Sequence, residues 1–225
     1  MYTIDICVKI MNNKNFPNVS SKDVYNTLIG KITPDIETRY PLYNWKQIWL
    51  NIHNKTVDRY DRLISYKFIY DILPTKRRLK IMNVPGYNTD KCEICDIPET
   101  NLHLLYFCSK VNGLFKSILC MIEQFCNIKI IDPFAFVFFD FRVSGKWRNI
   151  CAVIISSYIS IIWNCRNEQL GHTVLVRKFK NKLRYNIKSI LLGSIVNEEQ
   201  KMIFRIWITD VKLSLLICIC TGIHA

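Results

Sequence analysis

Three cysteines and one histidine lie within 17 residues of each other, and this cluster constrains the fold more than any other feature of the chain. Cys92, Cys95, His103 and Cys108 form the pattern C-x2-C-x7-H-x4-C. Two thiolates separated by two residues can bind one tetrahedral metal ion from a tight turn. Three sulfur ligands and one nitrogen ligand make a closed structural zinc site with no open position for a small-molecule substrate. We therefore expect one zinc ion, whose binding contributes to the free energy of folding.

Two other interpretations of these cysteines are weaker. The chain has ten cysteines, so the four residues could be reduced core cysteines beside one histidine. Polar and turn-forming residues between them favour a ligand cluster instead. A disulfide framework is disfavoured, because the chain is far longer than about 100 residues and residues 1–10 lack the basic and apolar regions of a secretory signal. We expect an intracellular protein of the nucleus or cytoplasm, not a secreted one.

Further motifs surround the cluster. They are Tyr43-Asn44-Trp45-Lys46-Gln47-Ile48-Trp49, Leu73-Pro74-Thr75, Glu99-Thr100 with His103-Leu104-Leu105 and Cys108, and Ile162-Trp163-Asn164-Cys165-Arg166-Asn167. Together they resemble the zinc-binding module that follows the reverse transcriptase domain in non-LTR retrotransposons. The resemblance covers residues 20–170, and the Leu-Pro-Thr turn and the run around His103 are its most specific parts. The family's usual glycine after the second cysteine is Asp96 here, which removes no ligand.

The resemblance implies a non-catalytic module of a retrotransposon polyprotein. Such a module would bind RNA or target DNA, assist target-primed reverse transcription and have the reverse transcriptase region of the same element as a partner. On this basis we divide the chain into a tail or linker (1–42), a zinc-binding module (43–141) and a helical extension (142–225). Residues 1–42 would be a remnant of the upstream polymerase region.

The basic charge of the chain points independently to a polyanionic partner. The net charge is +13, of which +5 lies in residues 45–90 and +6 in residues 151–225. An excess of this size favours nucleic acid first and an acidic membrane second. The candidate phosphate contacts are Lys76, Arg77, Arg78, Lys80, Arg177, Lys178 and Lys182. The alternative is that both clusters are ordinary solvated helix faces and serve solubility.

Apolar residues at helical spacing predict a mainly α fold, and glycine and proline are sparse at seven each. Helices are expected over 43–54, 57–73, 111–131, 148–164 and 174–192. Residues 134–141 hold five phenylalanines and predict one short buried strand or extended segment. The apolar stretches 148–164 and 213–223 are too short for a bilayer, so no membrane span is expected.

The chain lacks the residue patterns of the common catalytic sites. A reverse transcriptase needs adjacent aspartates to hold two metal ions, and no two aspartates are adjacent here. A restriction-like nuclease built from Asp132, Asp140 and Lys146 has poor spacing and is disfavoured. We therefore expect no enzymatic activity. The alternative to nucleic-acid binding is a zinc-stabilised structural or protein-interaction domain.

Overall fold

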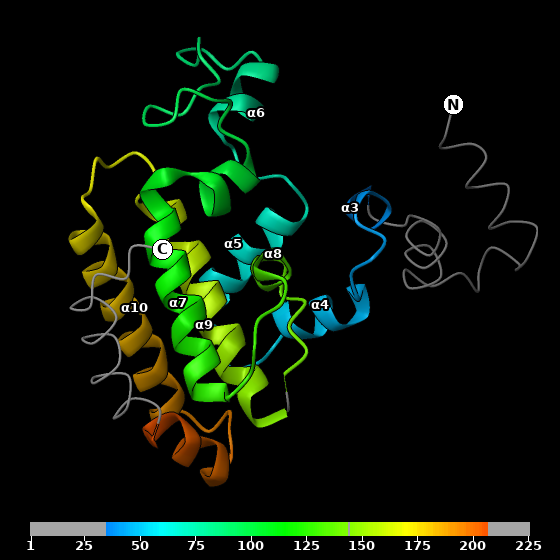
Figure 1. Ribbon diagram of the computed structural model, residues 1–225, viewed down its shortest axis with the longest axis vertical. Helices are drawn as coiled ribbons and strands as arrows, with labels where there is room; N and C mark the ends of the chain where they lie inside the picture. Colours follow the sequence, from blue (N-terminus) through cyan, green and yellow to red (C-terminus); the bar gives the residue numbers. More distant parts are fainter. Residues whose placement is uncertain (1–34, 144, 207–225) are drawn as a thin grey trace, which may run out of the picture. The chain divides into compact units, whose positions relative to one another are not determined.

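Figure 1 shows a computed structural model of the chain, which describes residues 35–143 and 145–206. The chain divides into two units, Met1–Pro41 and Leu42–Ala225. The described part of the first unit includes the short helix α3 (Asp35–Arg39). The interpretations given above for residues 1–34 and 213–223 lie outside the described residues.

The described part of the second unit is built from helices and loops, with one isolated antiparallel bridge between Lys91 and Pro98. This confirms the predicted mainly helical fold. The helices are α4 (Trp45–Ile52), α5 (Arg59–Ile69), α6 (Lys76–Ile81), the π-helix η2 (His103–Phe107), α7 (Ser109–Cys126), α8 (Pro133–Val137), α9 (Gly145–Asn164) and α10 (His172–Leu192). All five predicted helices are present, most of them with ends that differ by two to five residues.

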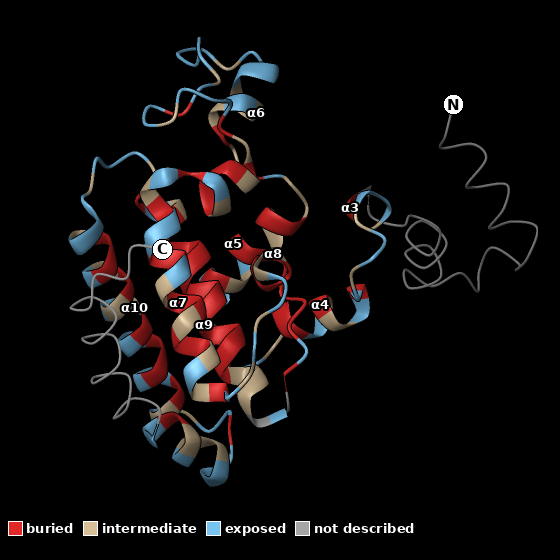
Figure 2. Ribbon diagram, viewed as in Figure 1, coloured by how far each residue is buried: buried red, intermediate tan, exposed pale blue. Residues whose placement is uncertain are grey.

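Helix α9 is the centre of this unit. Every residue from 151 to 160 is buried, and α9 packs against α4, α5, α7, η2 and α10. Figure 2 shows the buried residues concentrated on α9 and on the inner faces of its neighbours. Helices from both sides of the predicted boundary between 141 and 142 therefore share one core. Within the described ranges, no helix is both long and apolar enough to cross a membrane.

The prediction of an extended segment at residues 134–141 is wrong. Its first half is helix α8, which begins at Pro133 because the Asp132 carboxylate accepts hydrogen bonds from the backbone N–H groups of Phe134 and Ala135. A continuous apolar run has no periodicity that separates helix from strand, so the capping residues decide the structure. The chain then turns at Phe139, whose φ is +62° and whose carbonyl accepts a hydrogen bond from Asn51 Nδ2 at 2.7 Å.

A buried ion pair joins α5 to α10 beside the central helix. Asp61 is fully buried, and its Oδ1 lies 2.9 Å from Lys182 Nζ. Asn186 Nδ2 donates to Asp61 Oδ2 and to Ser157 Oγ, so the network also reaches α9. Lys182, which the sequence suggested as a phosphate contact, is therefore committed to neutralising a buried carboxylate.

We predict that Lys182→Met destabilises the fold by about 2–3 kcal/mol, because it leaves the Asp61 charge buried without its partner. This value lies below that of a fully buried pair because the Lys182 side chain is 19% exposed. The measurement is urea denaturation followed by circular dichroism. The control is Lys188→Met on the exposed face of α10, which should change stability by less than about 0.5 kcal/mol. Equal midpoints for the two variants would contradict the prediction.

Candidate metal centre

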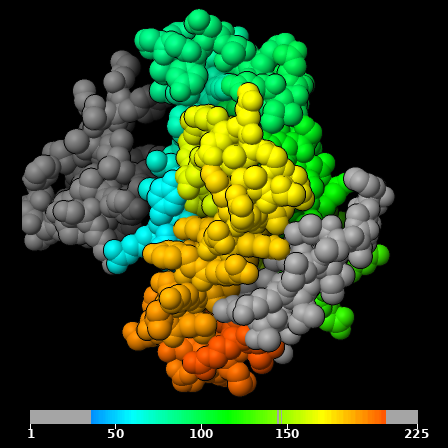
Figure 3. All heavy atoms as spheres, turned by 90° about the vertical axis from the view of Figure 1, so that its left-hand side faces the viewer, coloured from blue at the N-terminus to red at the C-terminus, as the bar shows by residue number. Residues whose placement is uncertain are grey.

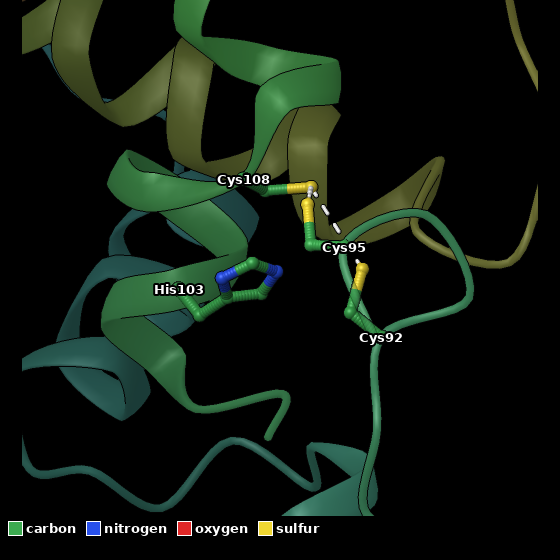
Figure 4. A group of neighbouring side chains, drawn as sticks. All are labelled: Cys92, Cys95, His103 and Cys108. Atoms are coloured by element: carbon green, nitrogen blue, oxygen red, sulfur yellow. Dashed lines mark hydrogen bonds between the residues drawn. The ribbon is translucent and has the colours of Figure 1, made fainter. Parts of the chain in front are cut away.

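The four residues of the C-x2-C-x7-H-x4-C pattern converge on one point. Cys92 and Cys95 come from a loop, His103 is the first residue of η2, and Cys108 stands between η2 and α7. Figure 4 shows their side chains pointing toward one another, and their ligand atoms all lie within 4.8 Å of each other. This group could hold a metal ion.

The loop that carries Cys92 and Cys95 is a tight knuckle closed by backbone hydrogen bonds. Cys92 N–H donates to the carbonyl of Ile97 at 2.8 Å, and Asp96 N–H donates back to the carbonyl of Cys92 at 3.0 Å. Asp96 has a φ of +54°, the left-handed region that glycine adopts most easily and that aspartate tolerates. Asp96 is therefore compatible with the tight turn of the knuckle.

A turn of π-helix brings His103 and Cys108 to the same side. In an α-helix, residues five apart diverge around the axis, so the sequence predicted that one of the two lies at a helix end. Cys108 does end η2, and its N–H donates to the His103 carbonyl at 2.7 Å, the i→i+5 hydrogen bond of a π-helix. This wider turn places residues five apart nearly above one another, which lets both side chains face the knuckle.

The spacing of the sulfur atoms matches tetrahedral coordination. Cys108 Sγ lies 3.9 Å from Cys92 Sγ and 3.8 Å from Cys95 Sγ. For metal–sulfur bonds of about 2.3 Å, the edge of a regular tetrahedron is about 3.8 Å. The thiols are thus separated as ligands of a common ion would be, and they are too far apart for disulfide bonds.

The imidazole of His103 has no hydrogen-bond partner in the part of the chain that the structure describes. It is 3% exposed, and both ring nitrogens are buried without a hydrogen bond among the described residues. Burial lowers the pKa of His103, and the charge of Glu99 only partly opposes this effect. A buried neutral imidazole with an unpaired nitrogen costs free energy unless something binds it. A metal ion at the centre of the cluster would use that nitrogen.

The pKa values of the Cys95 and Cys108 thiols are shifted in opposite directions. Burial opposes ionisation of Cys95, but hydrogen bonds from the Ser109 side chain and backbone, and from the neighbouring thiols, lower its pKa. Burial, aided by the charges of Cys92 and Cys95, raises the pKa of Cys108 to about 12. Without a cation the Cys108 thiol resists ionisation beside its two cysteine neighbours. A bound metal ion would supply the positive charge that makes all three thiolates.

The N-terminus of helix α7 lies beside the thiols and favours their ionised form. Cys108 is its N-cap residue, so the partial positive charge at the start of this 18-residue helix lies next to the sulfur cluster. Ser109 Oγ lies 3.3 Å from Cys95 Sγ and is able to donate to a thiolate. Sequence reasoning did not find Ser109, although its position directly after the last ligand at a predicted helix start was the available signal.

Glu99 fastens the knuckle to α6. From its place in the motif, this residue could support either a helix N-terminus or a metal ligand. Its carboxylate is 5% exposed and accepts the backbone N–H of Lys76, the first residue of α6, at 3.0 Å. Glu99 therefore supports a helix N-terminus, in addition to the cap that Thr75 provides.

The structure divides the candidate phosphate contacts into paired and exposed cations. Ion pairs join Lys76 to Glu93, Lys80 to Asp90 and Lys178 to Glu168. Arg78 donates to the Asp71 carbonyl. Arg77 on α6 and Arg177 on α10 are exposed, and no ion pair of either occurs among the described residues. The two clusters thus contain fewer unpaired cations than their sequences suggested.

Comparison of the chain with protein-family models, with curated proteins and with solved structures gave no match. The conclusions below therefore depend on the geometry of the chain itself.

We predict that Tyr158→Phe weakens the attachment of η2 to the core. Tyr158 of α9 is fully buried, and its hydroxyl donates to the Leu105 carbonyl at 2.5 Å. Loss of this bond leaves a buried carbonyl unsatisfied and should cost about 1–3 kcal/mol in urea denaturation. Tyr185→Phe on the exposed side of α10 removes the same atom and should have little effect. Identical stability of the two variants would show that the bond does not hold η2.

Proposed function

We propose that Cys92, Cys95, His103 and Cys108 bind one Zn²⁺ ion. The observation that carries this proposal is the sulfur spacing of 3.8–3.9 Å, the edge of a tetrahedron of zinc–thiolate bonds. Three thiolates and one imidazole also form a donor set that prefers zinc to hard cations such as Mg²⁺ or Ca²⁺. Four protein ligands would saturate the ion, so its role is structural and not catalytic.

The ion would hold in place a segment that has almost no core of its own. Within residues 76–98, all of which the structure describes, Cys92 is the only buried residue. Helix α6 and the knuckle therefore gain little from apolar burial, while η2 and α7 belong to the helical core. Zinc would link the two parts, because Cys92 and Cys95 come from the segment and His103 and Cys108 from the core.

We predict one zinc ion per purified chain by elemental analysis, and its loss in Cys95→Ser and Cys108→Ser. Loss of the ion should unfold residues 76–98 locally, since the helical core buries its own apolar surface. Amide hydrogen exchange should therefore quicken in residues 76–98 and stay slow in α9.

The matched control is Cys120→Ser on α7, outside the ligand group, which should retain the full zinc content. Well-folded wild-type protein without zinc would refute the metal assignment. Loss of zinc without faster exchange in the knuckle would refute its structural role.

We further propose that the module binds RNA or single-stranded DNA through phosphate groups, as the resemblance to retrotransposon modules implies. In that setting it would act beside a reverse transcriptase and would not itself be an enzyme. The support is the net charge of +13 and the position of α6, a helix with four cations fixed next to the metal centre. The ion pairs of Lys76 and Lys80 involve an exposed carboxylate, that of Glu93, and a partly exposed one, that of Asp90, and contribute little, so a phosphate group is able to displace them.

Four exposed apolar side chains on one short segment favour the alternative of a protein-interaction domain. Ile81, Met82, Ile94 and Ile97, on α6 and the knuckle, are 48–70% exposed. Apolar side chains gathered on one small segment are typical of protein contact surfaces. The alternative predicts no nucleic-acid binding at physiological salt, so the following measurement separates the two functions.

We predict that wild-type protein binds a fluorescein-labelled oligouridylate in fluorescence anisotropy titrations. With three or four phosphate contacts, log affinity should fall against log salt with a slope of about −2 to −3. Arg77→Ala/Lys80→Ala should flatten this slope by about 1.4, the effect of two lost phosphate contacts on a single strand, and retain zinc, since neither residue is a ligand.

The control is Lys116→Ala/Lys129→Ala, which removes the same charge from exposed positions on and just after α7. Wild-type protein that shows no binding at about 0.1 M salt would favour the protein-interaction alternative.

A further inference from the structure

A hollow of about 480 Å³ lies between the loop that precedes α5 and the last turns of α10. Its size falls within the range of small-ligand pockets, about 300–1,000 Å³. Figure 3 shows cyan residues of the α4–α5 region bordering orange residues of α10 on one face of the molecule. The hollow shares no lining residue with the metal centre.

Three cations line the hollow. Lys55 and Arg59 are exposed, and neither has an ion pair or hydrogen bond from its side chain among the described residues. Arg62 is half-buried and its Nη2 donates to the carbonyls of Asn54 and Val57, which fixes the guanidinium against the loop. Along the sequence, Arg59 and Arg62 are typical of an ordinary charged helix face. The fold instead gathers the three cations around a concavity, and Lys55 and Arg59 have no ion pair there with any residue that the structure describes.

The one acidic residue in the lining is already engaged. Asp58 is the N-cap of α5, and its Oδ1 accepts the backbone N–H groups of Tyr60 and Asp61 at 2.9 and 3.4 Å. Its charge is directed at the start of the helix. The hollow therefore has a net positive lining, and such a concave positive surface attracts anions more strongly than a flat one.

We propose that this hollow binds the phosphate group of a nucleotide unit, with Lys55 and Arg59 as the direct contacts and Arg62 as the fixed wall. If the nucleotide unit is part of a single strand, this proposal rests on the nucleic-acid binding proposed above. It differs in location, because the sequence placed the phosphate contacts on α6 and α10, where three of the lysines in the two clusters have acidic partners.

The lining also suits the rest of a nucleotide. The space is much larger than an inorganic phosphate ion needs, so it has room for a sugar or base. Thr56 and Ser189 bring hydroxyl groups to the lining, and Ile195, which is 57% exposed, offers an apolar surface. The expected ligand is therefore a phosphorylated nucleoside, either free or as part of a single strand.

The test uses Lys55→Ala/Arg59→Ala, because both side chains are exposed and their removal breaks no contact found in the described residues. The full chain is titrated with labelled oligouridylate by anisotropy and with adenosine 5′-monophosphate by calorimetry. We expect strand affinity to fall about tenfold and the salt slope to flatten by about 1.4, the effect of two lost phosphate contacts. Lys116→Ala/Lys129→Ala removes equal charge elsewhere and should lose much less.

The two ligands distinguish the source of the phosphate. A loss of strand binding alone assigns the hollow to the backbone of a nucleic acid, and a loss of mononucleotide binding assigns it to a free or terminal nucleotide. Both results support the proposal. If the hollow variant and the control behave alike toward both ligands, the proposal is overturned, even when wild-type protein binds the strand. If wild-type protein binds neither ligand, nucleic-acid binding and the hollow both fail, while the zinc assignment is unaffected.

Discussion

The metal centre depends on one turn of π-helix. A four-ligand tetrahedron needs His103 and Cys108 on the same side, and an α-helix would separate residues five apart. The hydrogen bond from Cys108 N–H to the His103 carbonyl widens the turn and solves this problem. The same turn is fastened to the core, since Tyr158 of α9 bonds the Leu105 carbonyl. Two of the four ligands are thus fixed by the most buried part of the protein before any ion binds.

The other two ligands belong to a part of the chain that cannot stabilise itself by burial. The segment 76–98 buries only Cys92, and it is held to the rest by polar contacts such as the bond from Lys76 N–H to Glu99. A domain built this way has two levels of stability. The helices around α9 are held by the hydrophobic effect, and the knuckle would be held by the proposed metal coordination. Chelation should therefore affect the surface that α6 presents without dissolving the fold.

The sequence was informative where the determinants are local. The spacing of Cys92 and Cys95 and the helical periodicity of α7, α9 and α10 were sufficient to predict the ligand group and the mainly helical fold. The segment 134–141 was predicted wrongly, because an apolar run without periodicity is ambiguous and the Asp132 cap was overlooked. The π turn was not predicted, since no simple residue pattern distinguishes it from an α-helical turn. Only the need to bring two ligands together hinted at it.

The sequence alone does not show which basic side chains are paired in the folded protein. Lys182 seemed equivalent to its basic neighbours, yet it neutralises Asp61, a buried residue on a helix far away in the chain. Lys55 and Arg59 seemed ordinary, yet the fold leaves them unpaired at the edge of a hollow in the part of the chain that the structure describes. Net charge attracts a polyanion from a distance, but the contacts are made by cations whose charge the fold has not already satisfied. In the proposed phosphate site, the cations are therefore chosen by where the fold places the start of α5 and the end of α10, not by the density of lysine and arginine along the sequence.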